Sequence, residues 1–219
     1  MSNPDSFVDE VTDAVRRDKL FAAFRKYGWI GVLLVVLIVG GAAYNEWQKS
    51  SAAARAQAFG DAALGALEQT EAAARGTALA AIAADGDQRA VQALLVAGNL
   101  EGDKASSLAA LDALSADATV AQVYRDLAVL RRVALAGAEQ PIADRRTALQ
   151  AVAVPGRPFR TLAEEQLAYL LIEEGQTEAA LTALTALVQD QESPGAMRRR
   201  LGDVITALGG TVPTPVDAG

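Results

Sequence analysis

Two pairs of adjacent glutamates are the residues of this 219-residue chain whose types could perform acid–base chemistry. They are Glu164 with Glu165 and Glu173 with Glu174. General acid–base catalysis needs two groups that converge on one reacting atom. Neighbouring side chains on a helix point about 100° apart, so neither pair can converge in this way. We therefore expect both pairs to lie on a solvated helix face.

Other catalytic and metal-binding arrangements lack the residues they require. The chain has no His and no Cys, which removes thiolate and imidazole metal sites and the Ser-His and Cys-His nucleophile pairs. The motifs GxxxxGK[ST], GxGxxG and HExxH are also absent. The sequence therefore predicts a protein that is not an enzyme, with no catalytic residue, cofactor, metal or small-molecule substrate. A hydrolase with an unfamiliar carboxylate site is the competing interpretation.

Basic residues gather in three short clusters. These are residues 131–132, 145–146 and 198–200, all arginines, in a chain whose formal net charge is -7. Such clusters either form ion pairs with nearby Asp and Glu or hold an acidic segment of a partner. The acidic balance leaves no sustained basic surface for phosphates, so we expect no nucleic-acid partner.

An uncharged apolar segment near the N-terminus predicts a transmembrane helix over residues 27–47. Residues 27–45 carry no charge, and 19 helical residues extend for about 28 Å, close to the hydrocarbon thickness of a bilayer. Trp29, Tyr44 and Trp47 stand where interfacial aromatic residues are found. We predict that these three side chains anchor the helix in the bilayer.

Two other interpretations of this segment are a buried core helix and a cleaved signal peptide. A core helix rarely runs this far without a polar face, and the preceding acidic residues are unlike a short basic signal region. Five basic residues precede the span within 16–26 and two follow within 49–55. The positive-inside rule then places the N-terminus in the cytoplasm and the C-terminal part in the periplasm of a bacterium. Residues 1–26 form the cytoplasmic segment, either a short amphipathic helix or a partly ordered tail.

Three glycines punctuate the rest of the chain at nearly regular intervals. Gly102, Gly137 and Gly175 are separated by 35 and 38 residues, and an Ala- and Leu-rich helical segment stands on each side of each one. Helix-turn-helix units with a period near 34 are typical of tetratricopeptide (TPR) repeats, and a generic helical bundle with an accidental period is the alternative.

The unit around Gly175 fits this pattern best. It predicts close packing at Ala168 and Ala180, and apolar contacts on the second helix at Leu184 and Leu187.

The fold predicted for residues 48–209 is therefore an all-α, degenerate TPR-like solenoid. It closes with a helix that is capped by Ser193 and ends at Gly209 and Gly210, and residues 210–219 form a frayed tail. TPR stacks bind a peptide or helix in a groove formed by the first helices of the units. By spacing, we expect Tyr124, Arg125 and Tyr169 to border that groove.

Several segments together resemble the YfgM-like proteins, ancillary subunits of the SecYEG translocon. The resemblance covers EVTDAVRRDKLFAAFRKYGW before the span, GAAYNEWQ after it, PGRPFRTLAEEQLAYLLIEEG, and SPGAMRRRLGDVITALG. It implies a single-pass inner-membrane protein whose periplasmic TPR domain lies near the translocon and links emerging chains to periplasmic chaperones. It implies no catalytic residue.

The expected function is thus that of a membrane-tethered scaffold whose partners are the lipid bilayer and other proteins: translocon subunits, periplasmic chaperones or exported chains. The competing assignment within the same architecture is an assembly or stabilising factor for another inner-membrane complex, in cytochrome biogenesis or respiration.

Overall fold

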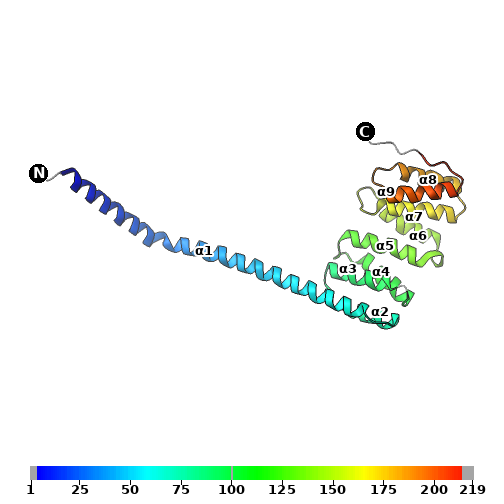
Figure 1. Cartoon of the computed structure of the whole chain (residues 1–219), viewed down its shortest axis with the longest axis horizontal. Coiled ribbons are helices and arrows are strands. Elements are labelled where there is room, and N and C mark those ends of the chain that lie inside the picture. The colour runs from blue at the N-terminus through cyan, green and yellow to red at the C-terminus, as the bar shows by residue number, and fades with distance from the viewer. Residues whose placement is uncertain (1–3, 100, 214–219) are drawn as a thin grey trace. The chain divides into compact units, whose positions relative to one another are not determined.

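The chain is entirely helical over the residues that the structure describes. The computed structural model describes the backbone of residues 4–99 and 101–213, and the side chains in these ranges apart from 4–24, 27 and 28. Within them, every regular element is a helix (Figure 1). The elements are α1 (Pro4–Leu67), α2 (Ala72–Ala80), α3 (Asp87–Gly98), α4 (Lys104–Ala116), α5 (Gln122–Ala136), the 3₁₀ turn η1 (Gly137–Glu139), α6 (Ile142–Val152), α7 (Arg160–Glu173), α8 (Thr177–Gln189) and α9 (Gly195–Ala207). The predicted all-α class is confirmed.

The predicted membrane segment belongs to one long helix. Helix α1 runs without interruption from Pro4 to Leu67, so the predicted span and the first helix after it are a single element. The chain divides into two compact units, Met1–Ala58 and Phe59–Gly219, and α1 passes from the first into the second. The predicted amphipathic face of residues 1–26 concerns side chains that lie almost wholly outside the described residues.

In the unit Phe59–Gly219, consecutive helices from α2 to α9 pack on one another (Figure 1). The buried side chains of this unit form three apolar clusters, the first between α3, α4 and α5, the second between α5, α6 and α7, and the third between α7, α8 and α9. Because α5 and α7 each contribute to two clusters, the core is continuous along the series although no helix lies at a common centre. Ala168, Ala180 and Leu184 are fully buried, as their positions predict.

The three predicted glycine turns join α3 to α4, α5 to α6 and α7 to α8. Gly175 has a φ of +74°, and the amide of Gln176 donates to the carbonyl of Leu171 over 2.8 Å, which closes the end of α7. Gly102 is needed for a different reason, since a Cβ there would lie 2.6 Å from the side-chain nitrogen of Asn99. The recurring residue type thus serves a left-handed turn in one unit and a close contact in another.

The predicted start of the last helix is wrong by one residue. Helix α9 begins at Gly195 with Pro194 before it, and no side chain caps it. Ser193 is buried instead, and its hydroxyl has no hydrogen-bond partner. Pro194 keeps an extended backbone, with φ of −60° and ψ of 146°, and takes the cap position itself. The end is as predicted, because Gly209 has a φ of +82° and the Gly210 amide donates to the Ile205 carbonyl over 2.9 Å. Of the predicted tail, 214–219 lies outside the described residues.

Candidate functional site

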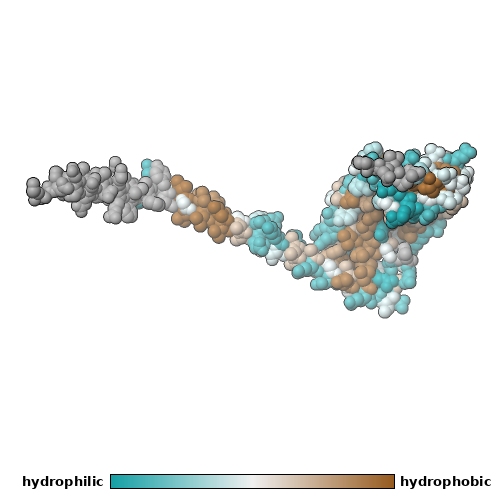
Figure 2. Space-filling view, turned by 45° about the horizontal axis from the view of Figure 1, so that its top comes forward, coloured by the Kyte–Doolittle hydropathy of each residue, from teal (hydrophilic) through white to brown (hydrophobic). Residues whose placement is uncertain are grey.

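The apolar part of α1 is exposed along its whole length. The segment Trp29–Leu67 contains a window of mean hydropathy 1.7 with none of its residues buried, and it is a candidate membrane span near the N-terminus. Figure 2 shows its apolar stretch as a band of hydrophobic surface. Residues 32–39 are all Val, Leu or Ile and all exposed. An isolated helix surface of this kind gains free energy by leaving water, since each apolar side chain transferred to hydrocarbon is favourable.

The three predicted anchor residues lie at the ends of this apolar stretch. Trp29, Tyr44 and Trp47 are 63%, 63% and 66% exposed, and the rings of Tyr44 and Trp47 are 6.1 Å apart and tilted by 40°. Amphipathic rings at this depth suit the boundary between hydrocarbon and headgroups. Their role as anchors stays a prediction.

A second apolar surface lies on the Phe59–Gly219 unit. Val91, Leu94, Leu95 and Gly98 recur at helical spacing along one face of α3, and they line a cavity of about 690 Å³ together with Leu67 at the end of α1. A neighbouring cavity of about 410 Å³ lies between α3, α4 and α5. Gly98 and Arg131 line both cavities, which therefore form one groove. We call it the Leu94 groove. Its walls come mainly from α3 and α5, and α1 contributes Leu67.

The two arginines at the rim of the Leu94 groove, Arg75 and Arg131, differ in the contacts that they make. Arg75 is held by three partners: its Nε donates to Asn99 over 3.0 Å, one Nη to the carbonyl of Gln69 over 3.1 Å, and the other Nη lies 3.4 Å from Glu101. Arg131 is exposed and makes no hydrogen bond or ion pair within the described part of the chain. The groove therefore carries one uncompensated positive charge beside its leucines.

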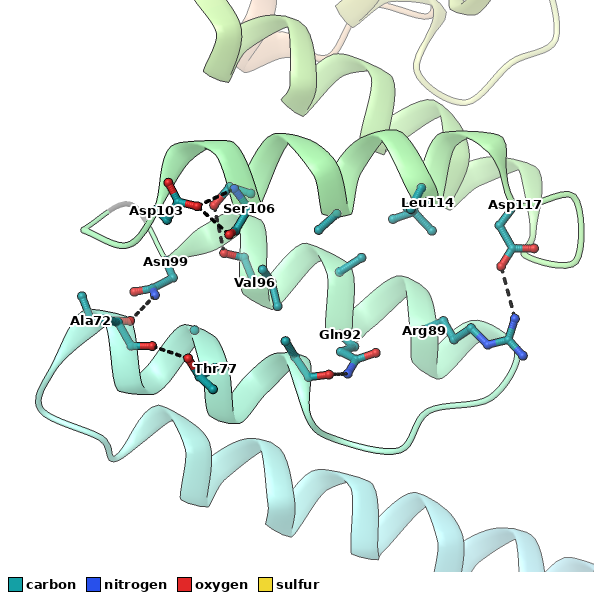
Figure 3. A pocket seen from close by; sticks show the side chains of 17 residues that line it. Ala72, Thr77, Arg89, Gln92, Val96, Asn99, Asp103, Ser106, Leu114 and Asp117 are labelled. Atoms are coloured by element: carbon teal, nitrogen blue, oxygen red, sulfur yellow. Dashed lines mark hydrogen bonds and ion pairs between the residues drawn. The ribbon is translucent and has the colours of Figure 1, made fainter.

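A third hollow lies on α2, α3 and α4 (Figure 3). Its volume is about 660 Å³, and alanines supply most of its apolar surface. At one end Arg89 lies 3.4 Å from Asp117, and at the other the Asp103 carboxylate caps α4 through the amides of Ala105 and Ser106. Between them, the side-chain nitrogen of Gln92 donates to the carbonyls of Leu79 and Ala80 at the end of α2, over 2.9 and 3.1 Å, and to that of Ile82 just after it, over 2.7 Å. These polar groups hold the three helices together.

Most arginines of the three basic clusters form ion pairs with Asp or Glu of the same unit, which is one of the two roles predicted for these clusters. Arg145 binds Glu173 with both terminal nitrogens at 2.8 and 2.6 Å, and Arg146 lies 2.5 Å from Glu174. The two adjacent glutamates thus receive two different arginines, and they do not converge. The Arg145 guanidinium holds the pKa of Glu173 below its usual range through this hydrogen-bonded contact. Arg132 pairs with Asp112 in the same manner.

Glu165 contradicts the prediction of a solvated face. It is only 4% exposed, and its carboxylate accepts hydrogen bonds from Arg200 Nε at 2.9 Å, from Arg200 Nη2 at 2.7 Å and from the Tyr169 hydroxyl at 2.7 Å. The apolar contacts between α7 and α9 bury this face of α7, and Arg200 supplies the neutralising charge from 35 residues away. Its neighbour Glu164 faces Arg160, 2.9 Å away.

Tyr169, one of the three predicted groove residues, is part of this network. Its ring packs against the third apolar cluster. Burial, together with the hydrogen bond that its hydroxyl donates to Glu165, raises the pKa of Tyr169 to about 12. The network is a structural contact between α7 and α9, and it lies outside the Leu94 groove.

Tyr124 and Arg125 lie at the start of α5. Tyr124 is partly buried against the first apolar cluster, on the face of α5 that carries Arg131 two turns later. The Arg125 guanidinium donates to the side chain of Gln122, whereas its Nε is buried without a partner. The next residue, Asp126, is buried and accepts from Arg157 at 2.5 Å. Tyr124 therefore flanks the Leu94 groove along α5, and its contact with a partner stays a prediction.

These sites present apolar surface and a few charged groups. Among the described residues, no three carboxylates gather in a way that could hold a metal ion. The arrangement offers an apolar groove with an exposed guanidinium, that of Arg131, which makes no ion pair within the described residues. Comparisons of the chain with protein families, with curated proteins and with solved structures give no match.

Proposed function

We propose that this protein is a membrane-tethered helical scaffold that binds other proteins and catalyses no reaction. The observation that carries the proposal is the pairing of an exposed apolar helix with a helical unit that presents an open apolar groove. An exposed apolar patch on a helical unit is typical of an interaction surface. The first feature fits attachment to a bilayer, and the second fits attachment to a partner.

The helical unit in this proposal is a degenerate TPR-like array. Support comes from the hairpins at Gly102, Gly137 and Gly175, from the packing of consecutive helices from α2 to α9 on one another, and from three apolar clusters that overlap along the series. Repeat arrays of this kind use an extended face for binding rather than a central pocket.

The setting in this proposal is the bacterial inner membrane, with the N-terminus in the cytoplasm and the helical unit in the periplasm. The excess of Arg and Lys before the span supports this orientation. The resemblance of the sequence to the YfgM-like proteins supports a place beside the Sec translocon, where the unit would contact translocon subunits, exported chains or periplasmic chaperones.

Membrane attachment is tested by alkaline extraction and by a topology reporter. The full-length chain is expected to stay with the membrane pellet at high pH, and a reporter fused after Gly219 that is active only in the periplasm is expected to be active. Release of the chain into the supernatant would contradict the anchor, and an inactive reporter would contradict the orientation.

The partner is tested by crosslinking in cells. A photoreactive amino acid at Leu67 or Val91, both exposed in the Leu94 groove, is compared with one at Thr182, which is exposed on α8. Adducts with translocon subunits or periplasmic chaperones at the two groove positions, and not at Thr182, are expected. Adducts with one respiratory or cytochrome-biogenesis complex would instead establish an assembly factor, and the same adducts from all three positions would remove the groove from the proposal.

A further inference from the structure

The Leu94 groove contains two of the large apolar side chains that are exposed on the Phe59–Gly219 unit. Leu67 and Val91 are 42% and 38% exposed, and Leu64, one turn before Leu67, is 62% exposed. The hydrophobic area that the unit presents in Figure 2 spreads over several neighbouring residues. Contiguous apolar surface of this kind costs free energy in water and is retained where a partner covers it.

The walls of the groove favour a helical occupant. They are helix surfaces whose backbone groups are already paired within α1, α3 and α5. An extended peptide would bring unpaired backbone amides and carbonyls into an apolar groove that offers few donors, whereas a helix satisfies its own backbone. Successive helices pack about 9 Å apart, so three of them are crossed by about 18 Å of ligand, or roughly three to four helical turns.

The floor of the groove contains a position without a side chain. Gly98 lines both cavities, and a Cβ built on it would have no atom within 4 Å. The occupant can therefore approach the backbone of α3 closely at this point. A large side chain at position 98 would fill the groove without disturbing the fold.

The charge of the groove sets the chemistry of the partner. Arg131 is the guanidinium that both cavities share, and it has no carboxylate partner in the described part of the chain. Its neighbour Arg132 is turned away and pairs with Asp112. A carboxylate placed among apolar side chains would meet Arg131 beside a surface of reduced polarity, where an ion pair is worth more than in bulk water.

We propose that the Leu94 groove binds an amphipathic helix of a partner protein, with leucine-like side chains on Val91, Leu94 and Leu95 and an Asp or Glu on Arg131. This inference rests on the proposed role in protein binding and specifies the partner of that role. The recognised feature is an acidic residue within an apolar stripe, since the leucines supply affinity and the arginine selects the charge.

The test uses the full-length chain in phospholipid nanodiscs and a fluorescent synthetic helix of about four turns. The probe carries leucines at helical spacing and one Asp within the leucine stripe, and its matched control carries Asn in place of that Asp. Saturable binding of the Asp probe is expected by fluorescence anisotropy, with weaker binding of the Asn probe.

Two variants locate the contact. Gly98→Leu is expected to weaken binding of the Asp probe at least tenfold while the melting temperature stays the same or rises, because leucine has a higher helix propensity than glycine. Arg131→Ala is expected to weaken the Asp probe about fivefold and to leave the Asn probe unchanged. The matched control is Arg199→Ala, which removes an exposed arginine of α9 that also lacks an ion pair among the described residues.

The remaining outcomes overturn the inference. Absence of saturable binding, or equal losses for the Asp and Asn probes on Arg131→Ala, would remove the proposed recognition. A change in oligomeric state on Gly98→Leu, measured by light scattering, would make a second copy of this chain the occupant. Release of nanodisc contacts by Arg131→Ala, seen as faster protease cleavage of the groove helices, would make the lipid surface the occupant. Failure of the chain to enter nanodiscs contradicts the proposed anchor and is distinguishable from all of these.

Discussion

Substitution of Arg200 by alanine should destabilise the helical unit, whereas the same change at Arg199 should not. Arg200 gives two hydrogen bonds to Glu165, which is 4% exposed, and these bonds raise the pKa of Arg200 above its already high ordinary value. Arg199, the adjacent residue, is exposed and makes no ion pair among the residues that the structure describes. The comparison therefore isolates the buried contact from the loss of one positive charge on α9.

The magnitude follows from the burial of the two partners. Removal of one member of a fully buried pair costs about 3–5 kcal/mol, because it leaves an uncompensated charge. The Arg200 side chain is 53% exposed, so water can partly solvate Glu165 in the variant, and the Tyr169 hydroxyl still donates to it. We expect a loss of about 2 kcal/mol for Arg200→Ala and less than about 0.5 kcal/mol for Arg199→Ala.

The assay is chemical and thermal unfolding of the full-length chain in a mild detergent. For a unit of this size, about 2 kcal/mol corresponds to a fall in melting temperature of roughly 4–8 °C. The double variant Arg200→Ala with Glu165→Gln should recover part of the loss, because the buried charge is then absent and the two changes are coupled. Equal stabilities of the Arg199 and Arg200 variants, or full additivity in the double variant, would refute the reasoning.

Three further predictions concern titration and the turns. The pKa of Tyr169 is raised to about 12, so the contribution of this side chain to stability is complete below the ordinary tyrosine pKa near 10 and is lost as the pH rises through about 12. Absorbance at 295 nm should show a tyrosine that titrates at high pH, and Tyr169→Phe should remove this titration. Because Arg145 lowers the pKa of Glu173, the contribution of Glu173 to stability is complete above its ordinary pKa and is lost as the pH falls below it. Glu173→Gln should therefore flatten the acid side of a plot of melting temperature against pH. An unchanged acid side would contradict the contact. Gly175→Ala should lower the free energy of unfolding by about 1–2 kcal/mol because φ at this residue is +74°. Gly98→Ala, in helix α3, should raise it by about 0.5 kcal/mol. Denaturant midpoints of the two variants that move in the same direction would contradict these roles.

The features that the sequence predicts well are those with local physical causes. A run of uncharged apolar residues favours the same structure wherever it stands, and residues 29–47 accordingly lie in an exposed apolar helix. The turns at Gly137 and Gly175 follow from the freedom of glycine to adopt a positive φ, which needs no knowledge of the rest of the fold. The small residues Ala168 and Ala180 were predicted from their spacing to such a turn.

The features that it predicts poorly depend on partners far away in the chain. Nothing near Glu165 distinguishes it from Glu164, and its burial arises only when α9 brings Arg200 against α7. The Leu94 groove combines residues from α1, α3 and α5, so its apolar surface is not apparent from any one segment. Ser193 is a different case, because Pro194 keeps an extended backbone and takes the cap position itself, so α9 begins one residue later than the serine predicts.

Adjacent arginines of this unit face different surfaces, and this difference supports the proposed binding function. Helical geometry turns neighbouring side chains about 100° apart, so a pair such as Arg131 and Arg132 serves two surfaces. Arg132 is held by Asp112 and by Gln140, whereas Arg131 extends over the apolar groove. In Arg145 and Arg146, by contrast, both members are paired within the unit. Arg132, Arg145 and Arg146 each meet a carboxylate of this chain, whereas Arg131 meets none among the described residues. In the Leu94 groove, Arg131 lies beside half-buried leucines, and a carboxylate from another protein would complete both the charge and the apolar contact.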